Sequence, residues 1–179
     1  MEAPNRPCCR RFRRQRARPW QRICNGILIE RGDVVTALEK IRDWIAEYPN
    51  FNVLSTFQVD YTDQIPANGG IFPSGLVEVR RTEDILGNVE VENQYNFGLY
   101  YVFEKAPGDD IGATVNADWI MDFQEWVQEQ SIQGQVPVFG DKTTVAMAQN
   151  GVLYAADEEG TATYMVQLSV LFKKRFEVT

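Results

Sequence analysis

The chain has 179 residues, a formal net charge of −7 and no histidine. This length suits one domain of ordinary size, which buries roughly 70% of the surface that its unfolded chain exposes. Without histidine, the Ser-His and Cys-His arrangements that activate nucleophiles in many hydrolases and acyltransferases are excluded. The longest apolar runs are a few residues, far short of the ~20 that span a bilayer, so we expect no membrane contact. A secretory signal is not expected either, because the apolar stretch after the basic start is broken by Asn25 and Gly26 and ends at Glu30 without a small-residue cleavage pattern.

Charge is distributed unevenly along the chain. Residues 1–22 hold eight arginines and one acid, a local charge of +7, whereas the remainder holds 10 basic and 24 acidic side chains, a charge of −14. Composition favours a disordered basic tail over 1–24 that adds no stability, followed by one acidic domain over 25–179. An acidic body repels nucleic acid, so any such contact is expected through residues 6–22 alone.

We interpret the tail as a solvated segment, or as sequence translated upstream of the natural start, rather than as a nucleic-acid-binding segment. Only Phe12 and Trp20 could stack on bases there. The three cysteines, Cys8, Cys9 and Cys24, match no zinc spacing and are interpreted as free thiols in a reducing compartment. We therefore expect no metal and no cofactor.

A first helix is predicted over 34–48, with Asp33 as its cap and Pro49 as its end. An alternating strand over 53–61 follows. The stretch 65–75, IPANGGIFPSG, is predicted to be an irregular loop because of its glycines and prolines. Its apolar residues either fold back on the domain or dock on a neighbour, and both interpretations stay open. The candidate interface residues are Ile65, Ile71 and Phe72.

The stretches 76–82 and 89–104 predict a long hairpin that turns near 86–88. Its alternating glutamates, Glu90 and Glu92, are interpreted as a solvated strand face, because no base or ligand set accompanies them. The stretch 106–115 is predicted to be an ordinary loop, since its two aspartates lack the alternation of a calcium-binding loop.

A second helix, around which we expect the fold to be organised, is predicted over 117–133, with Asn116 as its cap and Gly134 as its stop. One stripe of this helix is apolar and carries two tryptophans: Trp119, Ile120, Phe123, Trp126 and Val127.

Strands are predicted over 136–139, 143–149, 152–155 and 161–172, with turns at 150–151 and 157–160. The fold class is α+β: a mainly antiparallel sheet with both helices packed on one face, and a long protruding hairpin.

With these elements in place, the stretches ADWIMDFQEWV, QVPVFGD and YMVQLSVLFKK and the order of elements over about residues 26–179 resemble the tail-terminator or tail-completion proteins of long-tailed bacteriophages, a family of minor structural proteins. The resemblance implies a small α+β subunit that forms a ring, commonly a hexamer, without enzymatic activity, catalytic residues or bound cofactor. Such a ring caps the tail tube and meets the head-completion proteins of the neck, at the head-proximal end of the tail in a virion assembled in the host cytoplasm. Ile65, Ile71 and Phe72 then become candidates for the subunit or tail-tube interface.

Two other functions stay open. Another neck component, such as a head-closure or adaptor protein, would share the acidic α+β character and differ in what it binds. A small-molecule enzyme would need a pocket that holds an acid or base with a perturbed pKa, and no stretch of the sequence predicts one.

Overall fold

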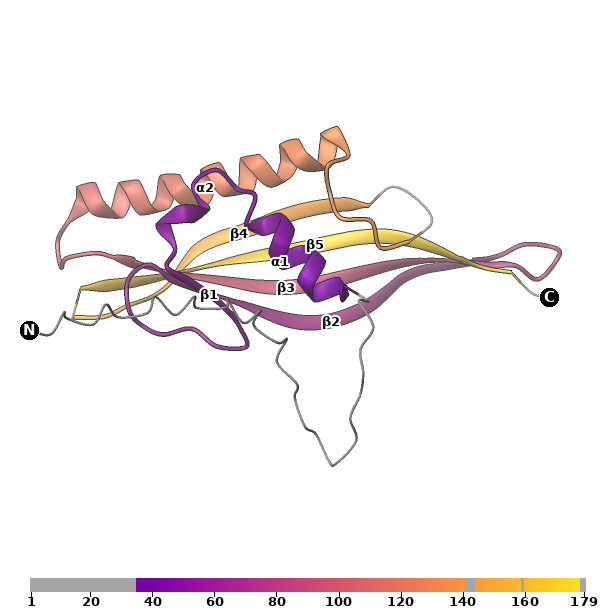
Figure 1. The fold of residues 1–179 in the computed structure, drawn as a ribbon, viewed down its shortest axis with the longest axis horizontal. Coiled ribbons are helices and arrows are strands. Elements are labelled where there is room, and N and C mark those ends of the chain that lie inside the picture. Colours follow the sequence, from indigo (N-terminus) through magenta and orange to yellow (C-terminus); the bar gives the residue numbers. More distant parts are fainter. Residues whose placement is uncertain (1–34, 141–143, 159, 178–179) are drawn as a thin grey trace, which may run out of the picture. The chain divides into compact units, whose positions relative to one another are not determined.

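The computed structural model describes residues 35–140, 144–158 and 160–177, which belong to one compact unit, Val35–Thr179. The tail predicted over 1–24 and the three cysteines lie outside the described residues. The elements in chain order are α1 (Ala37–Ile45), the 3-10 helix η1 (Phe51–Val53), β1 (Thr56–Val59), β2 (Asn68–Glu83), β3 (Val89–Glu104), α2 (Asp110–Gln133), β4 (Val145–Ala156) and β5 (Thr161–Phe176) (Figure 1).

The five strands form one sheet in the order β1-β2-β3-β5-β4. β1 pairs in parallel with the first four residues of β2, and every other pair of neighbours is antiparallel. The predicted long hairpin is confirmed, because β2 and β3 pair from Asn68↔Val102 to Glu83↔Val89. Its far end extends beyond the helices in Figure 1.

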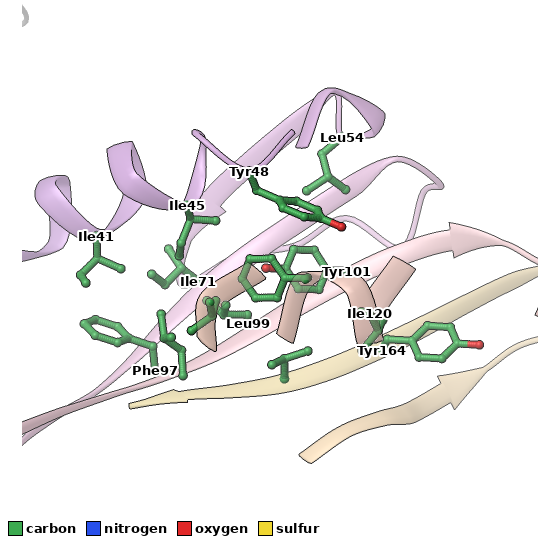
Figure 2. Close-up of a cluster of buried hydrophobic side chains, with 14 of the residues drawn as sticks. Ile41, Ile45, Tyr48, Leu54, Ile71, Phe97, Leu99, Tyr101, Ile120 and Tyr164 are labelled. Atoms are coloured by element: carbon green, nitrogen blue, oxygen red, sulfur yellow. The ribbon is translucent and has the colours of Figure 1, made fainter. Parts of the chain in front are cut away.

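Both helices cover the same face of this sheet, so the α+β class predicted from the sequence is confirmed. On β5 the alternate residues from Ala162 to Phe172 are buried, and on β3 Phe97, Leu99, Tyr101 and Phe103 face the same side. Strand residues share a face at every second position, which is why this alternation predicted a half-covered sheet. Figure 2 shows the resulting core between α1 and the strands.

Both helices begin at residues other than those predicted. α1 starts at Ala37 because Thr36 and Glu39 form a capping box, in which Thr36 Oγ1 accepts from Glu39 N and Glu39 Oε2 accepts from Thr36 N. The predicted cap Asp33 lies outside the described residues, and the helix ends at Ile45 rather than at 48.

α2 starts at Asp110, because Asp109 Oδ1 accepts from Gly112 N at 3.0 Å. The prediction of a loop over 106–115 is therefore wrong in its second half. Asn116, predicted as the cap, lies inside the helix, where it is buried and its Nδ2 donates to the carbonyl oxygen of Glu104 at 3.0 Å. The predicted stop is confirmed: Gly134 has a φ of 69°.

The predicted turn at 150–151 is wrong, because β4 runs through it as one strand. Asn150 has a φ of 54°, and the pairing with β5 shifts register between Gln149 and Val152, so the Asn-Gly pair makes a β-bulge. A Cβ at Gly151 would lie 2.6 Å from Ile120 Cγ2 and 2.6 Å from Gln124 Oε1. Glycine at this position therefore allows α2 to lie close to β4.

Two predicted strands are shortened or absent. The stretch 136–139 is not a strand: Val136 is buried, and the Phe139 ring lies 5.6 Å from Tyr95 and 5.8 Å from Phe172. Burial of Val136 and the ring contacts of Phe139, not backbone pairing, hold this stretch, while Val138 is exposed. The strand predicted over 53–61 is reduced to β1, because Phe51–Val53 forms a 3-10 turn.

Candidate interaction surface

The three residues predicted as an interface do not lie on one surface. The prediction of an irregular loop over 65–75 is wrong from Asn68 onward, where β2 begins. Ile71 is fully buried beneath the helices, and Phe72, the next residue, points to the opposite face of the sheet. Ile65 lies before the strand and is 62% exposed.

Glycine fits this part of β2 because neighbours come too close for side chains. A Cβ at Gly69 would lie 2.9 Å from the Phe57 ring, and one at Gly70 would lie 2.5 Å from the carbonyl oxygen of Tyr61. The glycines therefore do not break the strand here. They let β1 and the chain after it approach β2, which sequence propensity alone does not reveal.

The face of the sheet away from the helices, called the open face here, carries a row of aromatic rings. The Tyr100 ring contacts Phe72 edge-on at 5.0 Å and Tyr154 at 5.3 Å, so the row reaches from β2 across β3 to β4. Phe72 and Tyr100 are half-buried, and Tyr154 is 63% exposed. Other apolar residues whose strand pairing places them on this face are Val77, Val145, Met147, Val152, Met165 and Leu171.

A network of uncharged side chains crosses the middle of the open face. Asn96 Oδ1 accepts from Gln94 Nε2 at 2.6 Å and from Ser169 Oγ at 3.1 Å. Towards β4, Asn150 Nδ2 donates to Gln167 Oε1 at 2.7 Å. These hydrogen bonds make the middle of the open face polar without charge, a character suited to contact with another protein surface.

Each side of the sheet ends in an exposed strand. β1 pairs only with residues 68–71 of β2, and all eleven residues from 73 to 83 are exposed; we call this run the β2 edge. On the other side, the eight residues from 149 to 156 of β4 are exposed; we call this run the β4 edge. Within the described part of the chain, no strand pairs with the outer side of either run.

α2 lies along the first half of β4 and reaches as far as Gly151, whereas the outer side of the β4 edge pairs with no described strand. Ser131 Oγ accepts from the backbone N–H of Ala146 at 3.0 Å, and Gln124 Nε2 donates to the carbonyl oxygen of Ala148 at 3.3 Å. A groove of about 510 Å³ lies between the helix and this half of the strand. Beyond Ala148 no side chain of α2 makes a hydrogen bond to β4 in the described structure.

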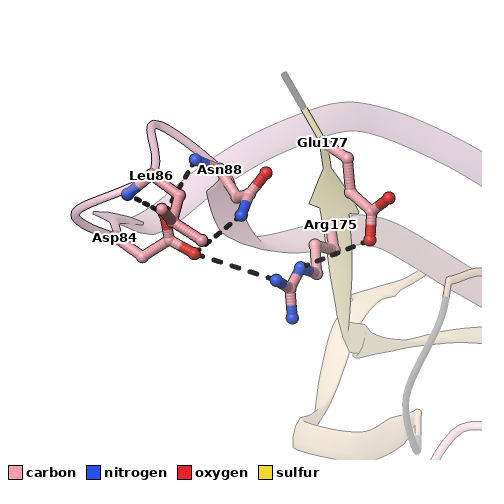
Figure 3. A network of polar contacts seen from close by, with 5 residues as sticks. All are labelled: Asp84, Leu86, Asn88, Arg175 and Glu177. Atoms are coloured by element: carbon pink, nitrogen blue, oxygen red, sulfur yellow. Dashed lines mark hydrogen bonds and ion pairs between the residues drawn. The ribbon is translucent and has the colours of Figure 1, made fainter. Parts of the chain in front are cut away.

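The hairpin end is held by one carboxylate (Figure 3). Asp84 Oδ1 accepts from the backbone N–H groups of Leu86 and Asn88, and its Oδ2 accepts from Asn88 Nδ2, all within 2.8–2.9 Å. Arg175 Nη2 lies 3.8 Å from Asp84 Oδ2. The side-chain hydrogen bond from Asn88 is the main cause that lowers the pKa of Asp84. Charge thus orders a turn at this site.

Within the part of the chain that the structure describes, no group of three or more acidic or cysteine side chains is placed to hold a metal ion. Among the same residues, no helix is both long and apolar enough to cross a membrane. The pKa of Tyr101 is raised well above its ordinary value because burial disfavours the charged phenolate. This residue lies in the core, where it contacts other rings rather than an open pocket.

No protein-family model matches the chain, and no curated protein matches its sequence. Sequence reasoning predicted a protruding hairpin, but it did not identify the β2 edge or the β4 edge as unpaired strand edges. One signal for the β4 edge was present, because residues 149–156 contain no charged side chain, and sheet edges are normally protected by charge or proline. The Asn-Gly pair predicted a turn, and a turn would divide this stretch into two short strands. For that reason no long exposed edge was predicted here.

Proposed function

We propose that this chain is a structural subunit of a bacteriophage tail that assembles into a ring, caps the tail tube and joins it to the head-completion proteins. The resemblance of residues 26–179 to tail-terminator proteins supplies the location. The observation that supports ring formation is that both edges of the sheet are exposed in one subunit, and each edge has large apolar side chains in water. Exposed surface of this kind is usually buried by a neighbour.

A ring covers both edges at once. Identical subunits related by a closed rotation place the same two surfaces against each other at every contact, so no edge is left over and growth stops. A dimer about a two-fold axis uses one edge of each subunit and leaves the other exposed. Two unlike edges on one sheet therefore favour a ring over a dimer.

The function proposed here needs surfaces rather than catalysis. On the open face, amide and hydroxyl groups are hydrogen-bonded to one another, and the aromatic rings contact one another. Such a surface adheres to a partner through complementary shape and desolvation. We propose that the tail tube protein and the neck proteins are those partners.

The test is to add the purified protein to assembling tail tubes and to image the head-proximal ends by electron microscopy. We expect tubes of limited length with a ring of added density at that end. Tubes that keep elongating with no added density would exclude the function. Density on the head side of the neck, separate from the tube, would instead favour a head-closure or adaptor protein.

A further inference from the structure

We infer that the β4 edge of one copy pairs in antiparallel fashion with the β2 edge of the next copy, so that the sheet continues from subunit to subunit around the ring. This inference rests on the proposed function and names the surfaces that build the ring. The occupant of each edge is thus a second copy of this chain.

The chemistry of the two edges favours a contact between unlike edges. The β4 edge carries Val152, Leu153 and Tyr154, which are 47%, 46% and 63% exposed, and it has no charged residue. The β2 edge carries four charges, Glu78, Arg80, Arg81 and Glu83, next to the exposed Leu76, Val77 and Val79. Charges of this kind hinder pairing between two like edges.

The charges on the β2 edge do not hinder an uncharged partner. Arg81 already pairs with Glu78 at 2.8 Å, so these two side chains neutralise each other on the strand. An incoming β4 edge brings no charge that must be desolvated or matched. Contact between a β2 edge and a β4 edge therefore brings four charged side chains into the interface, where contact between two β2 edges would bring eight.

Strand direction fits the same arrangement. β2 is antiparallel to β3, β3 to β5 and β5 to β4, so β4 runs opposite to β2 within one subunit. All subunits of a ring have the same orientation relative to the ring axis. The β2 edge of one subunit therefore runs antiparallel to the β4 edge of its neighbour. The extended sheet keeps the antiparallel order that it has inside the subunit.

The positions of the edges along the strands set the tilt of the sheet. Val152 pairs with Met165, Met165 with Tyr100, and Tyr100 with Gly70. Val77, on the β2 edge, pairs with Gln94, which lies six residues along β3 from Tyr100, because the bulge between Pro73 and Gly75 adds one residue to β2. Six residues are about 20 Å along the strand, while four strand spacings are about 19 Å. Pairing Val152 with Val77 of the next copy thus tilts the strands by roughly 47° from the ring axis, close to the ~35–45° typical of closed barrels.

The size of the contact also favours a closed ring. Eight residues make a ladder of about 27 Å, and with side chains reaching about 5 Å to either face the strip covers on the order of 300 Å² per partner. A stable standard interface covers about 800 Å² per partner. One contact is below that size, but each subunit of a closed ring makes two contacts. We therefore expect the closed ring to be stable where an isolated pair of subunits is not.

Paired cysteines test the contact directly. In the full-length chain with Cys8→Ser, Cys9→Ser and Cys24→Ser, we would compare Val152→Cys alone, Val77→Cys alone and both together. Both positions lie on the open face. After incubation with tail tubes and a short thiol-to-thiol cross-linker, we expect a covalent ladder from dimer to full ring for the double variant alone. A double variant with Val152→Cys and the exposed Val138→Cys is the matched control and should give no ladder.

Native mass spectrometry of the same samples separates this inference from the proposed function. A ring that forms without a ladder in the double variant would overturn the edge pairing and leave the ring function intact. Covalent dimers from Val152→Cys alone would mean that two β4 edges meet, which also overturns it. Absence of any ring or capped tube would overturn both proposals.

Discussion

Trp44 of α1 stacks on Trp126 of α2, with ring centroids 5.1 Å apart and an angle of 29° between the ring planes. Tyr48 extends this contact, because its ring lies 5.3 Å from Trp119 and 5.3 Å from Phe123. The two helices are therefore joined by aromatic rings above the sheet. This relationship makes α1 dependent on α2 for its position.

Replacing Trp126 should loosen that junction. Trp126 is half-buried, so Trp126→Ala should lower the free energy of unfolding by about 2–3 kcal/mol, less than the ~3–5 kcal/mol of a fully buried tryptophan. Urea unfolding followed by circular dichroism measures the change. Met121→Ala, at a 57% exposed position of the same helix, is the control and should change stability by less than about 0.5 kcal/mol. Equal effects of the two substitutions would contradict the junction.

Removing the hydroxyl of Tyr101 should not destabilise the protein. Tyr101 is fully buried, and its hydroxyl has no hydrogen-bond partner within the described residues. A buried polar group without a partner costs about 1–3 kcal/mol, so Tyr101→Phe should raise the free energy of unfolding by about 1 kcal/mol. Tyr101→Ala should lower it by about 3–5 kcal/mol, because it leaves a cavity. Thermal unfolding of both variants checks the pair, and a clear loss for Tyr101→Phe would show that the hydroxyl is satisfied.

Adding a methyl group at Gly151 should separate α2 from β4. The new Cβ would lie 2.6 Å from Ile120 Cγ2, a distance that requires one of the two elements to shift. Gly151→Ala should therefore cost about 1–3 kcal/mol by overpacking. Ala155→Val, at an exposed position of the same strand, should be close to neutral. Chemical denaturation of both variants measures the change in the free energy of unfolding. No change for Gly151→Ala would mean that α2 can move away from β4 without loss of stability.

The hairpin end should lose order in acid. Hydrogen bonds from Asn88 and Leu86 hold the pKa of Asp84 below its ordinary value of 3.8. A group whose pKa is lowered on folding contributes stability that is present above the unfolded pKa and is lost as the pH falls through the folded pKa. Amide hydrogen exchange at Leu86 and Asn88 should therefore be slow at neutral pH relative to Asp84→Asn, and the two proteins should converge as the pH falls below the lowered pKa of Asp84. Identical exchange in both proteins at pH 7 would contradict the role of Asp84.

Local patterns in the sequence were sufficient to predict both helices, the long hairpin and the last strand, and which faces of α2 and β5 are buried. The alternation over 164–172 predicted the buried side of β5, and the apolar stripe from Trp119 to Val127 predicted the covered face of α2. These signals depend only on the geometry of a single strand or helix, which repeats every two or 3.6 residues. They also allowed the α+β class and the long hairpin to be predicted.

Only the tertiary structure shows where a glycine or an Asn-Gly pair lies inside a strand and lets a neighbouring element come close, instead of forming a turn. Gly69 and Gly70 lie inside β2 because β1 and the chain after it come close, and Asn150-Gly151 lies inside β4 because α2 does. Those neighbours are distant in sequence, so no local pattern contains them. For the same reason Ile71 and Phe72, adjacent in an apparent loop, lie on opposite faces of the sheet, and the two exposed edges emerge only when all five strands are placed in order.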